Sequence, residues 1–272
     1  MKLVSGLLTL WAGLIAAFLL APLAIVLINS VGVEQYVIFP PSGFSFRWYG
    51  EIPDYYVDGA ILSIALAFVA ISVASLLAIP AGLAIARGSL PGRSLIDALL
   101  RSPIQIPLLI SGVAFLQFFT LVRGWTGVGL ADGFLGLVIA HTIVVSPYLL
   151  VAVVARLARY PDALDEAAYG MGASRLRVLF TITLPVIAPA IASGLFFAFL
   201  MSFDNVPTTV FLIQSGQTTL PLALFFDTEL DLSRVQYAVG TIVTLISTAV
   251  ILLAMRRFDL LPSARAGQRA AA

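Results

Sequence analysis

Few side chains in this sequence could take part in catalysis or hold a metal ion. The chain has no cysteine, which excludes disulfides, thiol catalysis and thiolate metal sites. Its glycine runs lack a Gly-Lys-Ser or Gly-Lys-Thr phosphate loop, so we expect the chain not to bind ATP itself. The single histidine, His141, lies in an apolar run and is interpreted as a packed, hydrogen-bonded residue rather than a proton relay. We therefore predict no catalytic residue, no metal ligand and no cofactor on this chain.

The most distinctive segment is a short amphipathic stretch between two long apolar runs, predicted to be a helix over about 162–177. Acidic residues lead and basic residues trail, as the helix dipole favours. A helix that lies flat on a membrane usually has a Lys- and Arg-rich face opposite bulky apolar residues. Here the early polar residues are acidic and the apolar ones are small, so we expect the helix to fit a groove on another protein. Its polar residues are Asp162, Asp165, Glu166, Arg175 and Arg177, and its apolar residues at helical spacing are Leu164, Ala167, Ala168 and Met171.

The rest of the chain has the composition of a membrane protein. Apolar residues make up 60% of the 272 positions and charged residues 11%, whereas about a quarter of a soluble domain is charged. Six charge-free windows are long enough to cross a hydrocarbon core of about 30 Å as helices. The lipid interior requires each backbone group to be paired within its own segment, so we predict helices rather than a barrel. The predicted spans are about 7–28, 60–86, 101–122, 134–156, 179–202 and 236–255.

A seventh charge-free window, 205–226, contains too many polar residues and prolines to be a span. Six spans place 12 of the 15 Lys and Arg residues on one side, all except Arg47, Arg123 and Arg234. Cytoplasmic loops carry such an excess, so both termini and the amphipathic segment are predicted to be cytoplasmic. The first apolar window is longer than the core of a signal peptide, and we expect it to be retained as a span.

The amphipathic segment resembles the cytoplasmic signature of the membrane subunits of bacterial binding-protein-dependent ABC importers. That signature is Glu-Ala-Ala, three residues, Gly, nine residues, Ile, one residue and Leu-Pro. The matching residues are Glu166-Ala167-Ala168, Gly172, Ile182 and Leu184-Pro185, with every gap preserved. The resemblance implies an all-α membrane protein of the type I ABC importer permease fold. It would have six transmembrane helices in a single domain, residues 1–272, and a cytoplasmic coupling helix, 162–177, between helices 4 and 5.

The resemblance also implies that the coupling helix contacts a separate ATP-hydrolysing subunit, which alone would bind ATP and Mg. Glu166 would contact basic or amide groups of that subunit. The two alanines would allow close approach, and Gly172 would allow the turn that follows. The residues predicted to couple this chain to the ATPase are Asp165, Glu166, Ala167, Ala168, Gly172, Ala173 and Arg175.

Shorter motifs are similar to those of spermidine/putrescine-type permeases, at 44–49, 90–94, 202–205 and 218–221. By this similarity Asp204 and Asn205 are the predicted substrate-pathway residues. An alternative for Asp204 is an acid at a helix end that packs against the dipole of a loop helix. Many relatives have an acid where this chain has Asn205, so it offers one carboxylate fewer to a dicationic solute. Permeases for ferric iron, thiamine, aminophosphonates or opines look similar at this level, so these substrates remain alternatives to a polyamine.

The implied partners follow from the importer class. They are a cytoplasmic dimer of ATP-binding subunits, a second and non-identical permease subunit, an external solute-binding protein and the lipid of a bacterial inner membrane, with no nucleic acid. Two other classes remain open. An ion-coupled secondary carrier would ordinarily need charged residues inside its spans, and a membrane scaffold protein would bind partners without moving a solute.

Overall fold

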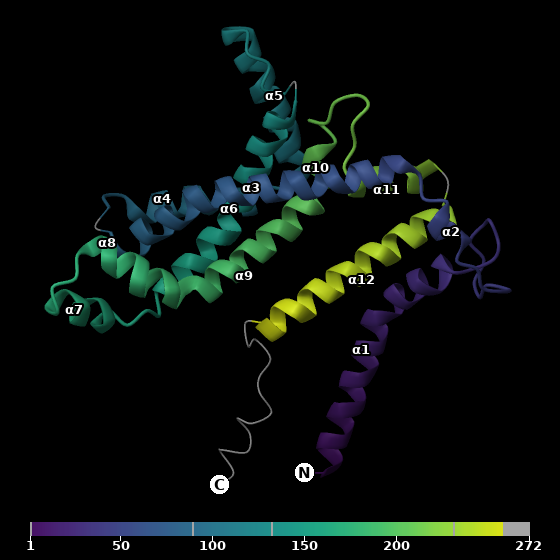
Figure 1. Cartoon of the computed structure of the whole chain (residues 1–272), viewed down its shortest axis with the longest axis horizontal. Coiled ribbons are helices and arrows are strands. Elements are labelled where there is room, and N and C mark those ends of the chain that lie inside the picture. Colours follow the sequence, from purple (N-terminus) through teal and green to yellow (C-terminus); the bar gives the residue numbers. More distant parts are fainter. Residues whose placement is uncertain (1, 89, 132, 231, 258–272) are drawn as a thin grey trace. The chain divides into compact units, whose positions relative to one another are not determined.

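The computed structural model describes residues 2–88, 90–131, 133–230 and 232–257 (Figure 1). Regular structure in these residues is helical, and the only extended pairings among them are two isolated bridges. The chain separates into a terminal unit, Met1–Asp54 with Leu224–Ala272, and a central unit, Tyr55–Ala223. The expectation of one membrane domain over the whole chain stays a prediction.

The predicted spans correspond to long apolar helices. Among the described residues, five helices are long and apolar enough to cross a membrane, and α12 (Arg234–Arg257) contains a shorter apolar stretch, Arg234–Val250. Window 205–226 is not one of them, because it holds only the short α10 (Val206–Thr209) and the first part of α11 (Leu220–Leu230). The five are α1 (Lys2–Ser30), α3 (Asp54–Arg87), α5 (Leu108–Thr126), α6 (Phe134–Leu157) and a run Arg175–Phe203, which consists of α8 (Arg175–Val178), the π-helix η2 (Leu179–Thr183) and α9 (Leu184–Phe203).

The third span begins later than predicted, at Leu108 instead of about 101. The two prolines before it explain the difference. The amphipathic α4 (Arg93–Arg101) gives way to a 3-10 turn, Ser102–Ile104, which contains Pro103. Pro107 then adopts an extended conformation, with ψ 130°, immediately before α5. Proline lacks an amide hydrogen and disfavours helix at the residue before it, so two prolines in five positions interrupt the helix.

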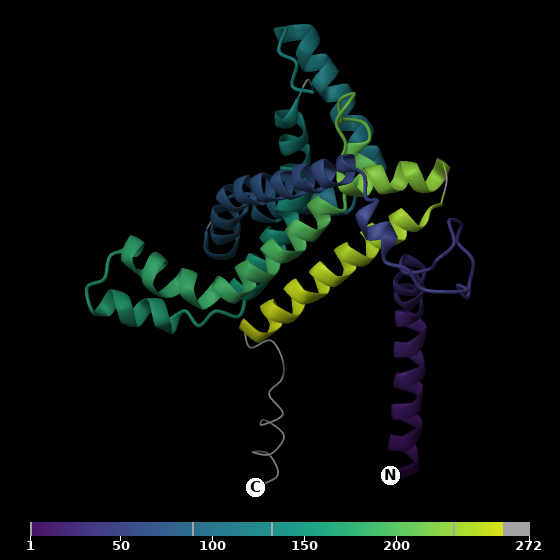
Figure 2. The ribbon, with the colours of Figure 1, turned by 45° about the vertical axis from the view of Figure 1, so that its right-hand side comes forward.

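The core of the central unit is built around α6, which packs lengthwise against α9 (Figures 1 and 2). More than half of the most apolar window of α6 is buried, 61% against 17% in the run that contains α9. Small residues allow the neighbouring helices to approach it. A Cβ on Gly194 of α9 would lie 3.1 Å from the Leu149 Cα, and one on Gly82 of α3 would lie 2.7 Å from the Val153 side chain. Helix packing in lipid depends on such close contact, because lipid gives apolar helix faces no reason to associate.

In the terminal unit, α1 packs against α12, and the short α2 (Arg47–Gly50) also contacts α12. The large apolar side chains of α1, such as Leu8, Trp11 and Phe18, are exposed. A helix that is apolar on all sides needs an apolar environment, and for a spanning helix lipid supplies it.

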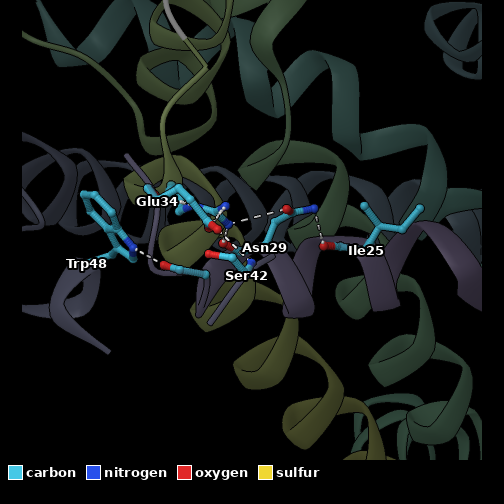
Figure 3. A network of polar contacts seen from close by, with 7 residues as sticks. Ile25, Asn29, Glu34, Ser42 and Trp48 are labelled. Carbon is cyan, nitrogen blue, oxygen red and sulfur yellow. Dashed lines mark hydrogen bonds and ion pairs between the residues drawn. The ribbon is translucent and has the colours of Figure 1, made fainter. Parts of the chain in front are cut away.

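An arginine at the start of α12 organises the segment that follows α1, which contains Glu34, Ser42 and Trp48 (Figure 3). The Arg234 side chain is fully buried. Its Nη1 donates to the carbonyl of Asn29 at 2.8 Å, its Nε donates to the carbonyl of Glu34, and its Nη2 pairs with Glu34 Oε2 at 2.8 Å. The second carboxylate oxygen of Glu34 accepts a bond of 2.7 Å from the Ser42 amide. Trp48 is also tied to this segment, because its indole nitrogen donates to a backbone carbonyl, that of residue 32, at 2.6 Å.

Candidate functional site: the segment between α6 and α9

The predicted coupling helix is two short helices joined by a tight turn (Figure 2). The first, α7 (Ala163–Gly170), ends well before 177, so the prediction of one helix over 162–177 is wrong at its C-terminal end. The Ala173 amide donates to the Ala168 carbonyl at 3.0 Å, and the Gly172 amide donates to the carbonyl three residues earlier at 2.9 Å. These two bonds form a Schellman motif, with Gly172 in its left-handed position at φ 85°.

The next helix begins directly after this turn. Ser174 is its N-cap, and the hydroxyl of Ser174 accepts a bond of 3.4 Å from the Arg177 amide. Gly172, Ala173 and Ser174 therefore separate α7 from the run Arg175–Phe203. Arg175 belongs to the first turn of the fifth candidate span, not to the coupling helix.

The residues predicted to contact the ATPase lie in different environments. Glu166 and Ala167 are exposed on α7, whereas Ala168 is only 3% exposed and packs inside this chain. Leu164 and Met171 are exposed apolar neighbours. The surface of α7 thus combines one carboxylate with apolar side chains. Of the remaining predicted residues, Gly172 and Arg175 are exposed, Ala173 is half-buried and Asp165 is buried.

Asp165 faces the chain itself, through a cluster that sequence reasoning did not find. Its Oδ2 forms an ion pair of 2.8 Å with Nη1 of Arg87, the last residue of α3. Its Oδ1 accepts hydrogen bonds from the hydroxyls of Tyr160 and Thr183. Arg87 was predicted only as one of the cytoplasmic basic residues, and Tyr160 and Thr183 have no motif of their own. Asp165 pairs with Arg87 across 78 positions and with Thr183 across 18, and no periodic pattern in the sequence indicates either pairing.

The cluster closes on itself. Arg87 Nη1 also donates to the Thr183 hydroxyl at 3.2 Å, and its guanidinium carbon lies 4.4 Å from the centre of the Tyr160 ring. Burial first, and the hydrogen bond to Asp165 second, raise the pKa of the Tyr160 hydroxyl above its ordinary value of 10.0. Tyr160 therefore stays protonated at neutral pH and keeps donating to the carboxylate.

The two predicted pathway residues form the junction between α9 and α10. Asp204 is exposed at the C-terminal end of α9. Asn205 is buried and caps α10, because its Oδ1 accepts a bond of 3.1 Å from the Thr208 amide. Its Nδ2 has no hydrogen-bond partner within the part of the chain that the structure describes. The junction thus presents one carboxylate at the surface and one unpaired amide beneath it.

His141 of α6 contacts both helices of this junction. It is 1% exposed, and its Nδ1 lies 2.9 Å from the Ser202 hydroxyl of α9. Its Nε2 lies 3.1 Å from the Thr209 hydroxyl of α10. Both ring nitrogens have partners, so the residue is a packed, hydrogen-bonded histidine, as the sequence predicted.

The close approach of α10 to α5 gives a testable requirement for Gly112. A Cβ at Gly112 would lie 2.8 Å from the Pro207 carbonyl oxygen and 3.0 Å from the Thr208 Cα. Both are backbone atoms, so Gly112→Ala must displace α10, and overpacking of this kind costs about 1–3 kcal/mol. We expect a lower midpoint of thermal unfolding for the purified chain. The matched control is Gly124→Ala in the same helix, where no atom lies within 4 Å of the new Cβ. Equal midpoints for the two variants would contradict the requirement.

Solved structures share this fold. A bacterial ABC transporter chain involved in the import of the acidic polysaccharide alginate matches with a TM-score of 0.72 and 15% identity, over 94% of this chain and 96% of that one. A chain of the inward-facing MetNI methionine ABC transporter matches with a TM-score of 0.59 and 18% identity, over 76% and 94%. The apolar helices and the segment between α6 and α9 thus define the permease fold of a type I ABC importer.

Sequence comparison places the chain more narrowly. A profile described as binding-protein-dependent transport system inner membrane component matches residues 78–261, and the chain belongs to this family. The putrescine transport system permease protein PotI of Escherichia coli K12 is 31% identical over 83% of this chain and 81% of its own length. The spermidine/putrescine permease protein PotC of Haemophilus influenzae is 29% identical over 87% and 90%. The putative 2-aminoethylphosphonate permease protein PhnV of Salmonella paratyphi A is 28% identical over 95% and 96%. The chain is a permease subunit of an ABC importer, with several apolar helices suited to an inner membrane.

Proposed function

We propose that this permease moves a polyamine, putrescine or spermidine, into the cell. The observation that carries the proposal is 31% identity to a putrescine permease over 83% of the chain. The exposed carboxylate of Asp204, at the junction of α9 and α10, offers an anionic group to a cationic amine. Asn205, beside it, adds an amide that has no partner among the described residues.

The energy would come from a partner, through α7. α7 exposes Leu164 and Glu166, and Met171 is exposed directly after it. A protein groove can bury the apolar side chains and bring a basic or amide group to the carboxylate. ATP would close a dimer of cytoplasmic ATP-binding subunits, which alone hold ATP and Mg. The resulting motion of α7 would rock the helices of the central unit between outward- and inward-facing arrangements.

The remaining partners complete the pathway. A second, non-identical permease subunit would form the other half, and an external binding protein would deliver the solute. In this arrangement both termini and α7 are cytoplasmic, which agrees with the excess of Lys and Arg in the segments on that side.

Reconstitution tests the function. The permease is placed in vesicles with its sister permease, the ATPase and the binding protein, and uptake of labelled putrescine, spermidine and 2-aminoethylphosphonate is measured with ATP inside. We expect uptake of a polyamine that requires ATP. ATP-dependent uptake of 2-aminoethylphosphonate alone would overturn the substrate assignment. Uptake that needs an ion gradient and no ATP, or no uptake of any solute, would overturn the importer mechanism.

A further inference from the structure

We propose that Arg87, Tyr160, Asp165 and Thr183 form a joint that fixes α7 to α3 and α9, so that Asp165 is a positioning residue for energy coupling. The inference rests on the proposed function and deepens it. It changes the predicted role of Asp165, which sequence reasoning placed among the residues that touch the ATPase. We name these four residues the Asp165 joint.

The Asp165 joint connects four segments of the central unit. Its members come from the end of α3, the residues after α6, α7 and the last residue of η2. Both oxygens of the Asp165 carboxylate are used, one in the ion pair with Arg87 and the other by the two hydroxyls. Charge-assisted bonds are shorter and stronger than neutral ones, and a connected network resists displacement of any single member. The side chain of Asp165 is 12% exposed and that of Arg87 30%, so the ion pair is partly shielded from water.

The run Arg175–Phe203 contains a π-helix where it passes the joint. Leu179–Thr183 is a π-helix, and Thr183, its last residue, is fully buried. Each residue of an α-helix turns by about 100°, so the wider π turn rotates the residues that follow it relative to a continuous α-helix. This rotation brings the Thr183 hydroxyl to Asp165 and Arg87. π-Turns are rare, and they occur frequently at functional sites.

α7 buries few of its own residues, and Ala168 is the buried apolar one. Its main packing contacts are with α8 and η2, and two turns connect it to the neighbouring helices. A short helix held only by flexible turns would yield when a partner pushes it. With Asp165 fixed to the ends of two spans, a displacement of α7 is transmitted to α3 and to the start of α9. Neighbouring Glu166, which is exposed, is free to contact the partner.

The test separates positioning from partner contact. In the reconstituted importer, Asp165→Asn keeps the size of the side chain and removes its charge. We expect about a tenfold lower ratio of solute transported to ATP hydrolysed, with the amount of bound ATPase unchanged. Glu166→Lys should instead reduce ATPase binding. The control is Asp97→Asn, which breaks the half-buried i,i+4 Asp97–Arg101 pair of 2.6 Å inside α4 and should leave the ratio unchanged.

A second measurement needs no partner. The chain has no cysteine, so Met171→Cys, 83% exposed just after α7, accepts a single spin label in the full chain in lipid discs. We expect Asp165→Asn, and to a lesser degree Thr183→Val, to increase the mobility of this label, with the double variant Arg87→Gln/Asp165→Asn no more mobile than the single ones. If Asp165→Asn fails to insert, Thr183→Val gives the same readouts.

Three results would overturn the joint. They are an unchanged transport ratio, loss of ATPase binding by Asp165→Asn equal to that of Glu166→Lys, and unchanged label mobility. If the unmodified chain shows no ATP-dependent uptake at all, the proposed function fails instead. The mobility measurement then still decides whether the four residues hold α7.

Discussion

Replacing Gly172 by valine is expected to reduce ATP-driven uptake about tenfold or more, because the turn after α7 requires a left-handed residue. Gly172 has φ 85°, and strain of this kind costs about 1–3 kcal/mol for a residue with a side chain. Since about 1.4 kcal/mol is a factor of ten in population, the population of the turn relative to other conformations would fall about tenfold or more. α7 would then no longer be held at its angle to the run Arg175–Phe203, and its exposed face would not meet the ATPase.

The cause is conformational and not steric, which a graded series can establish. No atom lies within 4 Å of a Cβ built on Gly172. Asparagine tolerates the left-handed region better than alanine, and a β-branched residue tolerates it least. Uptake should therefore fall in the order Gly, Asn, Ala, Val. Gly170→Ala is the matched control, because this glycine is equally uncrowded but lies in α7 without a positive φ. Equal uptake by Gly172→Val and Gly170→Ala would refute the requirement for the turn.

Replacing Arg234 by methionine is expected to disorder the segment that follows α1, with loss of assembly of the terminal unit. The change removes the donor of the 2.8 Å bond to the Asn29 carbonyl, and Asn29 is 1% exposed. The Asn29 carbonyl then keeps only the longer bond of 3.4 Å from the amide of residue 32, and loss of its main donor costs a buried acceptor up to about 1–3 kcal/mol. The Glu34 carbonyl loses its donor and the Glu34 carboxylate its ion pair in the same step. A lower unfolding midpoint and faster proteolysis within residues 31–53 are the measurements.

An exposed arginine of the same segment serves as the control. Arg47 lies 4.0 Å from the Trp48 ring, a contact worth only about 0.5–1 kcal/mol at an exposed site. Arg47→Met should therefore change the midpoint little. Arg234→Lys should be intermediate, since an ammonium cannot reproduce the fork of donors. The same midpoint for Arg234→Met and Arg47→Met would contradict the role of the buried guanidinium.

The stability of this segment is expected to fall at acidic pH. Hydrogen bonds from Ser42, with a smaller contribution from Arg234, lower the pKa of Glu34 from 4.5 to about 2. The folded pKa lies below the unfolded one, so the stabilisation is complete above pH 4.5. It is lost as the pH falls from 4.5 towards about 2. Glu34→Gln, measured in the same titration as the Arg234 variants, should remove this component.

Much of the fold follows from local patterns. Each predicted span is a continuous run of apolar residues. A single helix of that length crosses the hydrocarbon core and pairs its own backbone groups, so a span can be recognised from one segment of sequence. Two features of the coupling segment also follow from local sequence. They are the acidic start of α7 and the turn at Gly172. The exclusion of 205–226 as a span rested on its composition and on the distribution of Lys and Arg, and only two short helices begin there. Pro103 and Pro107 are also local features of the sequence. The continuous apolar run nevertheless led to a predicted start at about 101, whereas α5 begins only at Leu108.

The sequence by itself determined where the five long apolar helices lie, the position of the segment between α6 and α9, and the class of protein. Only the tertiary structure decided which acids face a partner and which face the chain. Asp165 and Glu166 are adjacent acids, yet one is buried against Arg87 and the other is exposed. Arg234 likewise pairs with Glu34 across 200 positions. A charge in a short segment carries no local sign of its partner, because the partner is chosen by how distant helices pack.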